Sequence, residues 1–451
     1  MRLYTTIITL TLLVTNIQAQ NNYTTENDST ENYSLFDNSP ISDNDIAHPD
    51  TLLFVDNTIV AEGDSLIFDI PESLTTNMDS LLSGWQARNL LKSFDCETEG
   101  WENIKVSDTL YATRLCNIPS IIEMPYNSMV RECIDRYAKR NRTLVSYLLG
   151  ISEFYMPMIE AEIDKHGMPH ELKYLPVIES ALNPKAVSRA GAKGLWQFMF
   201  ATGKLYGLKS NNYIDDRFDP LKATHAGLNY LRDLYKFFNR WDLAIAAYNC
   251  GPGNVKKAIL RSGGKTDFWE IYRYLPRETR GYLPALIAAN YIMTYHEEHG
   301  ICPMEPNLPI GTDTLHITKN LHFKQIEHFC DVSIEDIRAI NPQYIKDIIP
   351  GEAEPYILRL PNDAITKFIT HEKEIYEYNK EEFFPQKDIA KMLKDAKRND
   401  DGRGTLKYHK IRNGETLGSI ARKYRVSVKQ IMKWNNLRNT NIRAGRRLKI
   451  Y

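Results

Sequence analysis

One carboxylate stands in an apolar setting that suits acid–base chemistry. Leu172, Leu175 and Glu179 lie at i, i+3 and i+7 and therefore share one face of a predicted helix. Pro176 removes one backbone hydrogen bond and is expected to kink that helix just before the acid. Burial raises the pKa of a carboxyl group, and a carboxylic acid that stays protonated near neutral pH is what general acid catalysis requires. The spacing makes Glu179 a candidate general acid.

The same acid could instead be structural. An ionised carboxylate is tolerated in an apolar setting when a cation pairs with it. Lys185 and Arg189 follow Glu179 closely enough to supply that cation. The residues by themselves favour neither interpretation.

The elements that position this acid are expected to be helices. Between residues 81 and 305 apolar residues recur at steps of three and four, and strand-like alternation is scarce. The segment 241–249 carries alanines on its packing faces and stops at a Gly-Pro pair, which leaves Tyr248 and Asn249 at an exposed helix end. We therefore predict an all-helical domain over 81–305.

Two segments near the C-terminus repeat one another, which predicts a duplicated small module. The repeat appears when Leu417 is aligned with Phe323 without gaps; the further pairs are Ile420 with Ile326, Val426 with Val332, Ser427 with Ser333, Val428 with Ile334, Ile431 with Ile337, Trp434 with Ile340, and Asn435 with Asn341. Ser427 and Gln430 form a capping-box pattern before the second helix of the last copy. We expect strand–helix–helix–strand (βααβ) units over 306–365 and 407–451, joined by a charged helical linker over 366–406.

The N-terminal region differs in composition from the rest. Met1-Arg2, an apolar run from Leu3 to Val14, and Ala19 predict a secretory signal peptide over 1–19. Residues 20–80 contain no Lys or Arg and are rich in Asp and Glu, which predicts an acidic low-complexity tail or linker. We expect an exported, periplasmic protein, and we leave open whether it associates with the cell envelope or outer membrane.

Composition and motifs exclude several classes of function. Hydrophobic residues make up 43% and charged residues 25% of the 451 residues, which excludes a wholly disordered chain and a polytopic membrane protein. Six widely spaced cysteines permit disulfides, whose pairing is left open, but disfavour a zinc or redox CxxC site. His296 and His299 are spaced i, i+3 and do not match a zinc-binding HExxH motif. No metal, cofactor or nucleic acid is implied.

The segment around Glu179 resembles the catalytic core of lytic transglycosylases of the goose-lysozyme type. Four blocks occur in the family's order over about 140–295: Glu179-Ser180 with Asn183-Pro184 and Ser188; Gly191-Ala192 with Gly194-Leu195-Trp196-Gln197-Phe198-Met199; Ala247-Tyr248-Asn249 with Gly251; and Leu275-Pro276-Arg277-Glu278-Thr279-Arg280 with Tyr282. The resemblance implies a mainly α protein whose helical catalytic domain has a lysozyme-like fold.

The same resemblance implies a reaction on peptidoglycan. Glu179 would be the single acid/base: it would protonate the glycosidic oxygen between N-acetylmuramic acid and N-acetylglucosamine, then accept the proton of the muramic C6 hydroxyl. That hydroxyl would attack C1 and leave a 1,6-anhydro end, with no water consumed. Substrate would contact Ser188, Gln197, Met199, Tyr248, Asn249 and Tyr282. Core packing is the alternative for the aromatic residues, and for Tyr282 above all.

The last repeat resembles a LysM domain, a module that binds N-acetylglucosamine-containing glycans. The residues that carry the resemblance are Tyr408, Ile411, Gly414-Glu415-Thr416-Leu417, Ile420-Ala421, Tyr424, Val426-Ser427, Ile431, Trp434-Asn435 and Gly445. It implies glycan contacts from Gly414, Glu415, Thr416, Leu417, Asn436 and Leu437. The earlier copy has Asn320 and His322 in place of Gly414 and Thr416, so it is degenerate and its glycan binding stays open. Peptidoglycan strands are the expected partner; other cell-wall enzymes and a membrane are left open.

Two rivals remain for the function. A hydrolytic muramidase on the same fold would need a second carboxylate to activate water, for which Asp215, Asp216 and Asp219 are candidates. A non-catalytic cell-wall-binding scaffold would need only the LysM modules. The chain also departs from the family pattern: Phe200 stands where Pro is usual, and Cys250 replaces Ala or Ser beside Asn249.

Overall fold

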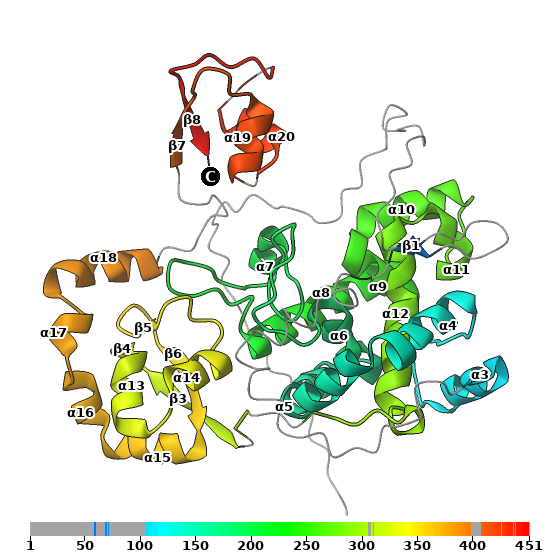
Figure 1. Ribbon diagram of the computed structural model, residues 1–451, viewed down its shortest axis with the longest axis horizontal. Coiled ribbons are helices and arrows are strands. Elements are labelled where there is room, and N and C mark those ends of the chain that lie inside the picture. Colours follow the sequence, from blue (N-terminus) through cyan, green and yellow to red (C-terminus); the bar gives the residue numbers. More distant parts are fainter. Residues whose placement is uncertain are drawn as a thin grey trace, which may run out of the picture. The chain divides into compact units, whose positions relative to one another are not determined.

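The computed structural model describes residues 58–59, 68–69, 71, 105–304, 308–309, 311–397, 407–424, 426–435, 437 and 439–450. The predicted signal peptide lies outside these residues. The described chain is mainly helical and carries small strand pairs toward its C-terminus, as predicted (Figure 1). No helix in this part of the chain combines the length and the apolar character needed to cross a membrane.

The helical domain contains ten α-helices among the described residues. They are α3 (Asp108–Asn117), α4 (Ser128–Asp135), α5 (Arg142–His166), α6 (Leu175–Ser180), α7 (Phe200–Leu205), α8 (Pro220–Phe238), α9 (Trp241–Cys250), α10 (Pro252–Arg261), α11 (Phe268–Ile271) and α12 (Arg277–Thr294). A π-helical turn at Arg136–Arg140 follows α4, and 3₁₀ turns occupy His170–Tyr174, Tyr272–Tyr274 and Glu297–His299.

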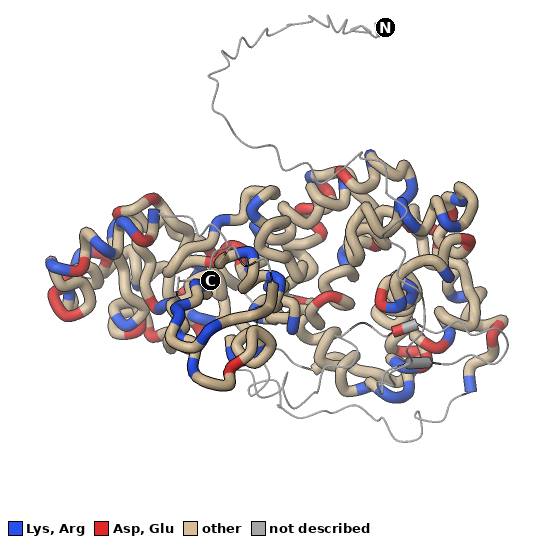
Figure 2. The backbone as a smooth tube through the Cα atoms, turned by 90° about the horizontal axis from the view of Figure 1, so that it is seen from above, with Lys and Arg blue, Asp and Glu red and all other residues tan. Residues whose placement is uncertain are grey.

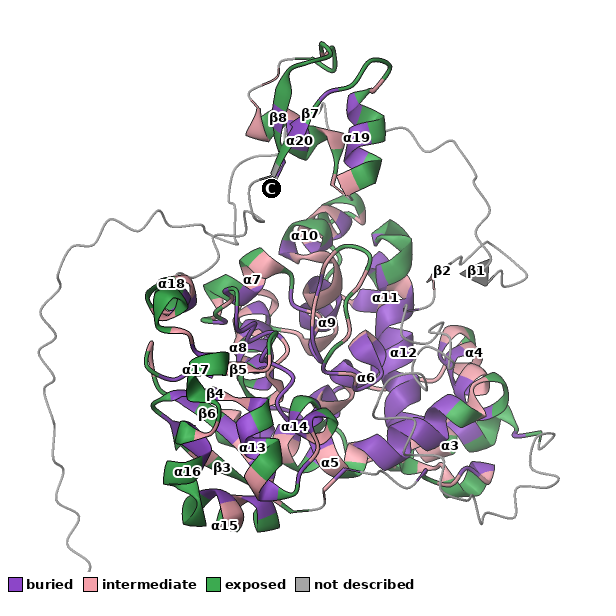
Figure 3. Ribbon diagram, turned by 60° about the vertical axis from the view of Figure 1, so that its left-hand side comes forward, coloured by how far each residue is buried: buried purple, intermediate pink, exposed green. Residues whose placement is uncertain are grey.

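Helix α12 forms the centre of this domain. It is buried along most of its length between Thr279 and Ile292, and Figure 3 shows it as a largely buried rod. It packs against α4, α6 and α9, while α8 packs against α5 and α9. Because α6 carries the first sequence block, α9 the third and α12 most of the fourth, this packing brings these blocks together.

Local sequence explains where the key helices begin and end. Helix α5 ends at Gly167, whose left-handed backbone (φ 60°) is the usual glycine helix stop. Helix α8 begins after Asp219, whose carboxylate accepts hydrogen bonds from the backbone N–H groups of Leu221 and Lys222. Pro220 occupies the first turn of α8, where its missing N–H leaves no helical bond unmade.

The predicted single helix kinked by Pro176 is wrong. The structure has a 3₁₀ turn at His170–Tyr174 followed by the separate short helix α6. Pro176 lies in the first turn of α6, where proline is favoured, so it helps to begin the helix that carries Glu179.

The acidic N-terminal segment also differs from the expected tail. Strands β1 (Thr58–Ile59) and β2 (Phe68–Asp69) pair antiparallel, and β2 packs against α12. Part of the range 20–80 is therefore attached to the helical domain, because a short strand pair needs an apolar support to be stable.

The middle module follows the predicted strand–helix–helix–strand order and adds to it. Its elements are β3 (Thr312–Ile317), β4 (Asn320–His322), α13 (Phe323–Cys330), α14 (Ile334–Ile340), β5 (Ile348–Pro350) and β6 (Tyr356–Pro361). Strand β3 pairs antiparallel with β6, and β4 pairs with β5. Ser333 caps α14, as its position in the repeat predicted.

The segment predicted as a linker after this module belongs to its core. It folds into α15 (Asn362–Thr370), α16 (Glu372–Glu377), α17 (Lys380–Phe383) and α18 (Gln386–Lys397). Phe368, Ile375 and Met392 are buried with the module's own apolar residues. Tyr213 and Ile214 of the helical domain join the same core, so these helices cover one continuous apolar cluster.

The C-terminal module is a compact βααβ unit. Strands β7 (Lys407–Lys410) and β8 (Arg447–Ile450) pair antiparallel, and α19 (Leu417–Tyr424) and α20 (Val428–Trp434) lie between them in sequence. The predicted capping box at Ser427 and Gln430 is confirmed. Figure 2 shows Lys and Arg along this module, whose sequence contains a single acid, Glu415.

Candidate active site

Glu179 lies in the last turn of α6, held by an unusual backbone. The two residues after Ser180, Ala181 and Leu182, both adopt left-handed conformations (φ 50° and 56°), which non-glycine residues rarely do. Both side chains are buried, and their N–H groups bond the carbonyls of Val177 and Pro176. Surrounding packing thus holds a strained turn directly after the acid, as occurs at functional sites.

The environment of Glu179 favours its protonated form. The residue is half-buried, and burial raises the pKa of its carboxyl group to about 7. The hydroxyl of Tyr282 donates a hydrogen bond to Oε1, which by itself lowers that pKa, and the charge of Glu278 raises it. A carboxyl group that titrates near neutral pH can both donate and accept a proton there.

The structural alternative for Glu179 receives no support from Lys185. That side chain is exposed, and the charged groups that act on it are Arg338 and Asp347 of the middle module. The hydrogen bond described for the Glu179 carboxyl comes from a neutral tyrosine.

Two tyrosines from different helices meet at this acid. Tyr282 is buried on α12 and points its hydroxyl at Glu179. Tyr248, half-buried near the end of α9, donates its hydroxyl to the carbonyl of Trp196 at 2.8 Å. Burial, reinforced by the nearby Glu179 carboxylate, raises the pKa of both hydroxyls well above the ordinary value, so both remain neutral donors. The buried position of Tyr282 suits its bond to the acid and agrees with the core-packing alternative, and its contact with a sugar stays a prediction.

The second block forms a small hairpin-like loop beside α6. Isolated bridges join Val187 to Lys193 and Lys193 to Phe198. The Ser188 hydroxyl accepts the N–H of Ala192 at 3.0 Å and so closes the turn. The loop is tied to α6 because the Ser180 hydroxyl donates to the carbonyl of Leu195 at 2.9 Å.

Gln197 and Met199, at the end of this loop, differ in how far their side chains are engaged. Gln197 has a left-handed backbone (φ 46°), and its side-chain amide donates to the carbonyl of Gly194 at 2.8 Å. Met199 is 47% exposed, an unusual exposure for a large apolar side chain. Met199 is therefore free to contact a ligand, whereas the amide nitrogen of Gln197 already serves the loop.

The loop is anchored by Trp196, whose importance the sequence interpretation missed. Trp196 is fully buried, and its indole N–H donates to Thr224 on α8 at 2.9 Å. A Cβ on Gly227 would lie 2.6 Å from the indole ring, so only glycine lets α8 approach this closely. Trp196 belongs to the second sequence block, so its place in that block could have drawn attention to it. No sequence motif distinguishes Gly227 on α8.

Asn249 is held by a residue of the fourth block. The Thr279 hydroxyl donates to Asn249 Oδ1 at 2.8 Å, which joins the end of α9 to the start of α12. Cys250 is a free thiol, half-buried, so no disulfide constrains this region.

The carboxylates proposed for a muramidase are engaged in structural contacts. Asp215 is fully buried and accepts bonds from Arg217 (2.7 and 2.9 Å) and Lys193 (3.1 Å), which outweigh burial and hold its pKa below the ordinary value. Asp216 pairs with Lys222 at 2.8 Å. Because both carboxylates are paired with cations, neither Asp215 nor Asp216 is available to activate water.

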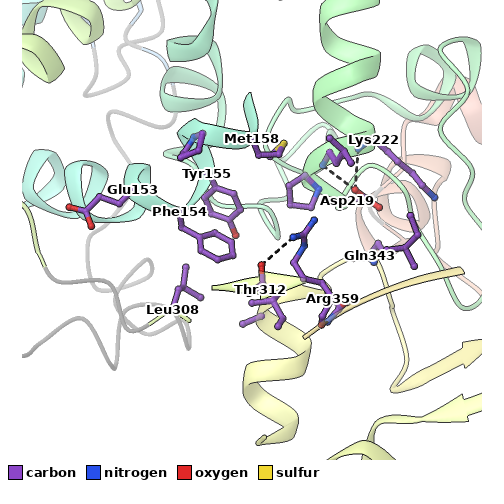
Figure 4. A pocket seen from close by; sticks show the side chains of 17 residues that line it. Glu153, Phe154, Tyr155, Met158, Asp219, Lys222, Leu308, Thr312, Gln343 and Arg359 are labelled. Carbon is purple, nitrogen blue, oxygen red and sulfur yellow. Dashed lines mark hydrogen bonds between the residues drawn. The ribbon is translucent and has the colours of Figure 1, made fainter. Parts of the chain in front are cut away.

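Asp219, the third candidate carboxylate, lies at the start of α8 beside a cavity. Besides capping α8, it lines a cavity of about 400 Å³ between α5, the start of α8 and the middle module. Figure 4 shows it there beside Lys222 and Gln343, with Arg359 bonded to Thr312 nearby. Burial raises the pKa of Asp219, but neither Glu179 nor the two tyrosines line this cavity.

The predicted glycan-binding residues of the C-terminal module divide into two groups. Gly414 has φ 83°, and Thr416 exchanges hydrogen bonds with Ser419 at the start of α19. Glu415 accepts hydrogen bonds from His409 (2.7 Å) and the N–H of Arg412 (2.8 Å), so it braces the loop.

The other three positions are placed differently. The glycan contact of Leu417 stays a prediction, and its side chain is 1% exposed and belongs to the module's apolar core. Leu437 is partly buried against the same core. Asn436 lies outside the described residues.

Comparisons with known proteins identify the family. The Transglycosylase SLT domain matches residues 156–271, the LysM domain matches 409–450, and the LysM-like domain of lytic transglycosylase MltD matches 311–377. The membrane-bound lytic murein transglycosylase D of Escherichia coli (strain K12) is 30% identical over 331 residues, which cover 72% of this chain and 70% of that protein. The chain belongs to the lytic murein transglycosylase family.

Other relatives match shorter parts of the chain or at lower identity. The soluble lytic murein transglycosylase of Escherichia coli (strain K12) is 34% identical over 123 residues, covering 26% of this chain and 19% of that protein. The crystal structure of the 70 kDa soluble lytic transglycosylase SLT70 from Escherichia coli is 22% identical, with a TM-score of 0.29, and the match covers 47% of this chain and 35% of that one.

Proposed function

We propose that this chain is a peptidoglycan lytic transglycosylase in which Glu179 is the catalytic acid and base. It cleaves the β-1,4 bond between N-acetylmuramic acid and N-acetylglucosamine and leaves a 1,6-anhydro-muramic acid end. The observation that carries the proposal is the half-buried Glu179, with a pKa raised to about 7 and a tyrosine hydroxyl on its Oε1.

The two proton transfers balance without water. Protonated Glu179 gives its proton to the glycosidic oxygen as the C1–O bond breaks and the N-acetylglucosamine end leaves. The resulting carboxylate takes the proton of the muramic C6 hydroxyl, whose oxygen bonds to C1. The attacking hydroxyl belongs to the same sugar, so ring closure gains from intramolecular proximity. A pKa near the working pH suits a group that must act in both directions.

The surrounding residues have separate tasks in this proposal. Tyr282 holds the Glu179 carboxyl and restrains its pKa. Tyr248 fixes the loop beside α6 through its bond to the carbonyl of Trp196. Asn249 accepts the Thr279 hydroxyl at the end of α9, and Ser188 closes the turn of the loop. Met199 offers an exposed apolar surface and Gln197 a side-chain oxygen to the sugar. We propose no cofactor.

The C-terminal module tethers the enzyme to glycan strands. Its excess of Lys and Arg also favours association with anionic cell-wall polymers. We propose that the protein acts outside the cytoplasm, in the periplasm. The sequence of residues 1–19 supports this location, and so does the disulfide bond at Cys302, because disulfides persist in oxidising compartments.

The test uses purified cell-wall sacculi and mass spectrometry of the released muropeptides. Wild-type chain should release products that end in 1,6-anhydro-muramic acid, lighter by one water than hydrolytic products, and Glu179→Gln should release none. Reducing ends would identify a muramidase instead. Binding to sacculi without release of any product, by wild type and variant alike, would identify a scaffold.

A further inference from the structure

We propose that Glu162, His166 and His225 form a zinc-binding site that joins α5 to α8. Glu162 and His166 are one helical turn apart near the end of α5, and His225 lies in the second turn of α8. The two helices pack against each other. The proposal is independent of the reaction assigned to Glu179.

The three ligand atoms already converge. His166 Nε2 lies 3.1 Å from His225 Nδ1, His225 Nδ1 lies 3.5 Å from Glu162 Oε2, and His166 Nε2 lies 4.0 Å from that oxygen. Ligands bound tetrahedrally at about 2.0–2.1 Å from zinc are separated by about 3.3 Å. Small side-chain rotations would therefore close the site around one ion.

The second oxygen of Glu162 completes the arrangement. Lys165 Nζ bonds Oε1 at 2.6 Å, which leaves Oε2 facing the two imidazoles. Bonds to the non-ligating side of a ligand are typical of metal sites, because they orient the ligand. The ion would replace the hydrogen bond between the two histidine rings, while Lys165 keeps its bond.

The ligand set and its exposure indicate the metal and its role. Two imidazoles and a carboxylate suit zinc, whereas calcium and magnesium prefer oxygen ligands alone. Glu162 and His166 side chains are each 8% exposed, and His225 is 59% exposed, so the site is preorganised on α5 and open to an ion from solvent. Bound zinc would cross-link the helix before the Glu179 turn to the helix that anchors Trp196.

Sequence patterns could not reveal this site. His166 and His225 are 59 residues apart, and only the packing of α5 on α8 brings them together. The spacing of these residues in the sequence accordingly implies no metal.

The test is a metal titration of the full chain, prepared without a polyhistidine tag and stripped with a chelator. Calorimetry should show one high-affinity Zn²⁺ site, and Co²⁺ should give visible absorption bands typical of a low-coordinate N/O site. Thermal unfolding should shift to higher temperature with Zn²⁺, because the ion binds only the folded arrangement. His225→Ala and Glu162→Gln test the ligands; His170→Ala is the matched control, since His170 is nearby and exposed but pairs with Asp164.

The variants decide the outcome. Removing a residue that hydrogen-bonds to a metal ligand weakens metal binding by about 10–100-fold. Removing a ligand itself should therefore weaken Zn²⁺ binding at least about tenfold. The control should bind as wild type does. Equal affinity in wild type and both ligand variants would place any bound zinc elsewhere and overturn the proposal, as would an absence of saturable binding. His225→Ala changes an exposed side chain, so circular dichroism should show that this variant is folded with and without Zn²⁺.

Discussion

Replacing Glu179 with glutamine should abolish cleavage and, at neutral pH and above, stabilise the fold. Glutamine keeps the size of the side chain and can still accept the hydrogen bond from Tyr282. It cannot give or take a proton, so neither step of the proposed reaction remains. It also cannot ionise in its partly buried position.

The stabilisation follows from the raised pKa. Burial raises the pKa of Glu179 from 4.5 to about 7, and each pKa unit corresponds to about 1.4 kcal/mol, so the whole shift is worth about 3 kcal/mol. Between these two values the folded chain holds a proton that the unfolded chain releases. Stability of the wild type therefore falls as pH rises through this window. The variant lacks that loss, so its advantage should grow from near zero at pH 4 to about 3 kcal/mol at pH 8.

Urea unfolding followed by tryptophan fluorescence measures this difference at several pH values. The same substitution at Glu153, an exposed acid on α5, is the control and should give a difference that does not vary with pH. A flat difference for Glu179→Gln across pH 4–8 would refute the reasoning about burial. Retained cleavage by that variant would refute the catalytic assignment.

Three further changes test other parts of the argument. Tyr282→Phe removes the hydroxyl that lowers the pKa of Glu179, so the pH optimum of sacculus cleavage should move upward and the rate should fall. Gly227→Ala places a methyl group against the Trp196 ring, and such overpacking costs about 1–3 kcal/mol, measurable by urea unfolding. Glu415→Gln should weaken sedimentation with sacculi while sparing cleavage of short soluble glycans, because the binding loop loses its brace.

Each of these changes has a control or a contrary result. Gly253→Ala, in α10 with open space around it, should not destabilise the protein, and an equal loss in both glycine variants would contradict the packing argument. An unchanged pH optimum in Tyr282→Phe would remove that hydroxyl from the account of the acid. Hydrogen bonds from the Arg412 N–H and His409 lower the pKa of Glu415, so wild-type binding should weaken as pH falls below 4.5; pH-independent binding would contradict the brace.

Local patterns in the sequence were enough for most of the elements and for the candidate acid. Apolar steps of three and four residues predicted the helical domain, the internal repeat predicted the two modules, and Ser427 with Gln430 predicted a helix start that the structure confirms. These features depend on residues within one or two turns of each other, which is the range that periodicity and capping report. Glu179 was singled out in the same way, from its neighbours on one helix face.

Contacts between distant residues were decided by the tertiary structure alone. Tyr282 meets Glu179 across 103 residues, and its burial could not be inferred from its place on a helix. Asp215 was a reasonable candidate base until its bonds to Arg217 and Lys193 were visible. The helices after residue 361 read as a linker because they are highly charged, yet Phe368, Ile375 and Met392 are buried in the core of the middle module.

The sequence by itself therefore determined which groups this protein has for chemistry and that most of them lie in a helical domain. The tertiary structure decided which of them meet, which are buried, and hence where a carboxyl group titrates near pH 7. The physical reason is that desolvation and pairing depend on everything packed around a group, including helices far away in the chain. The convergence of Glu162, His166 and His225 illustrates the same division, since none of the three is unusual until α5 and α8 pack together.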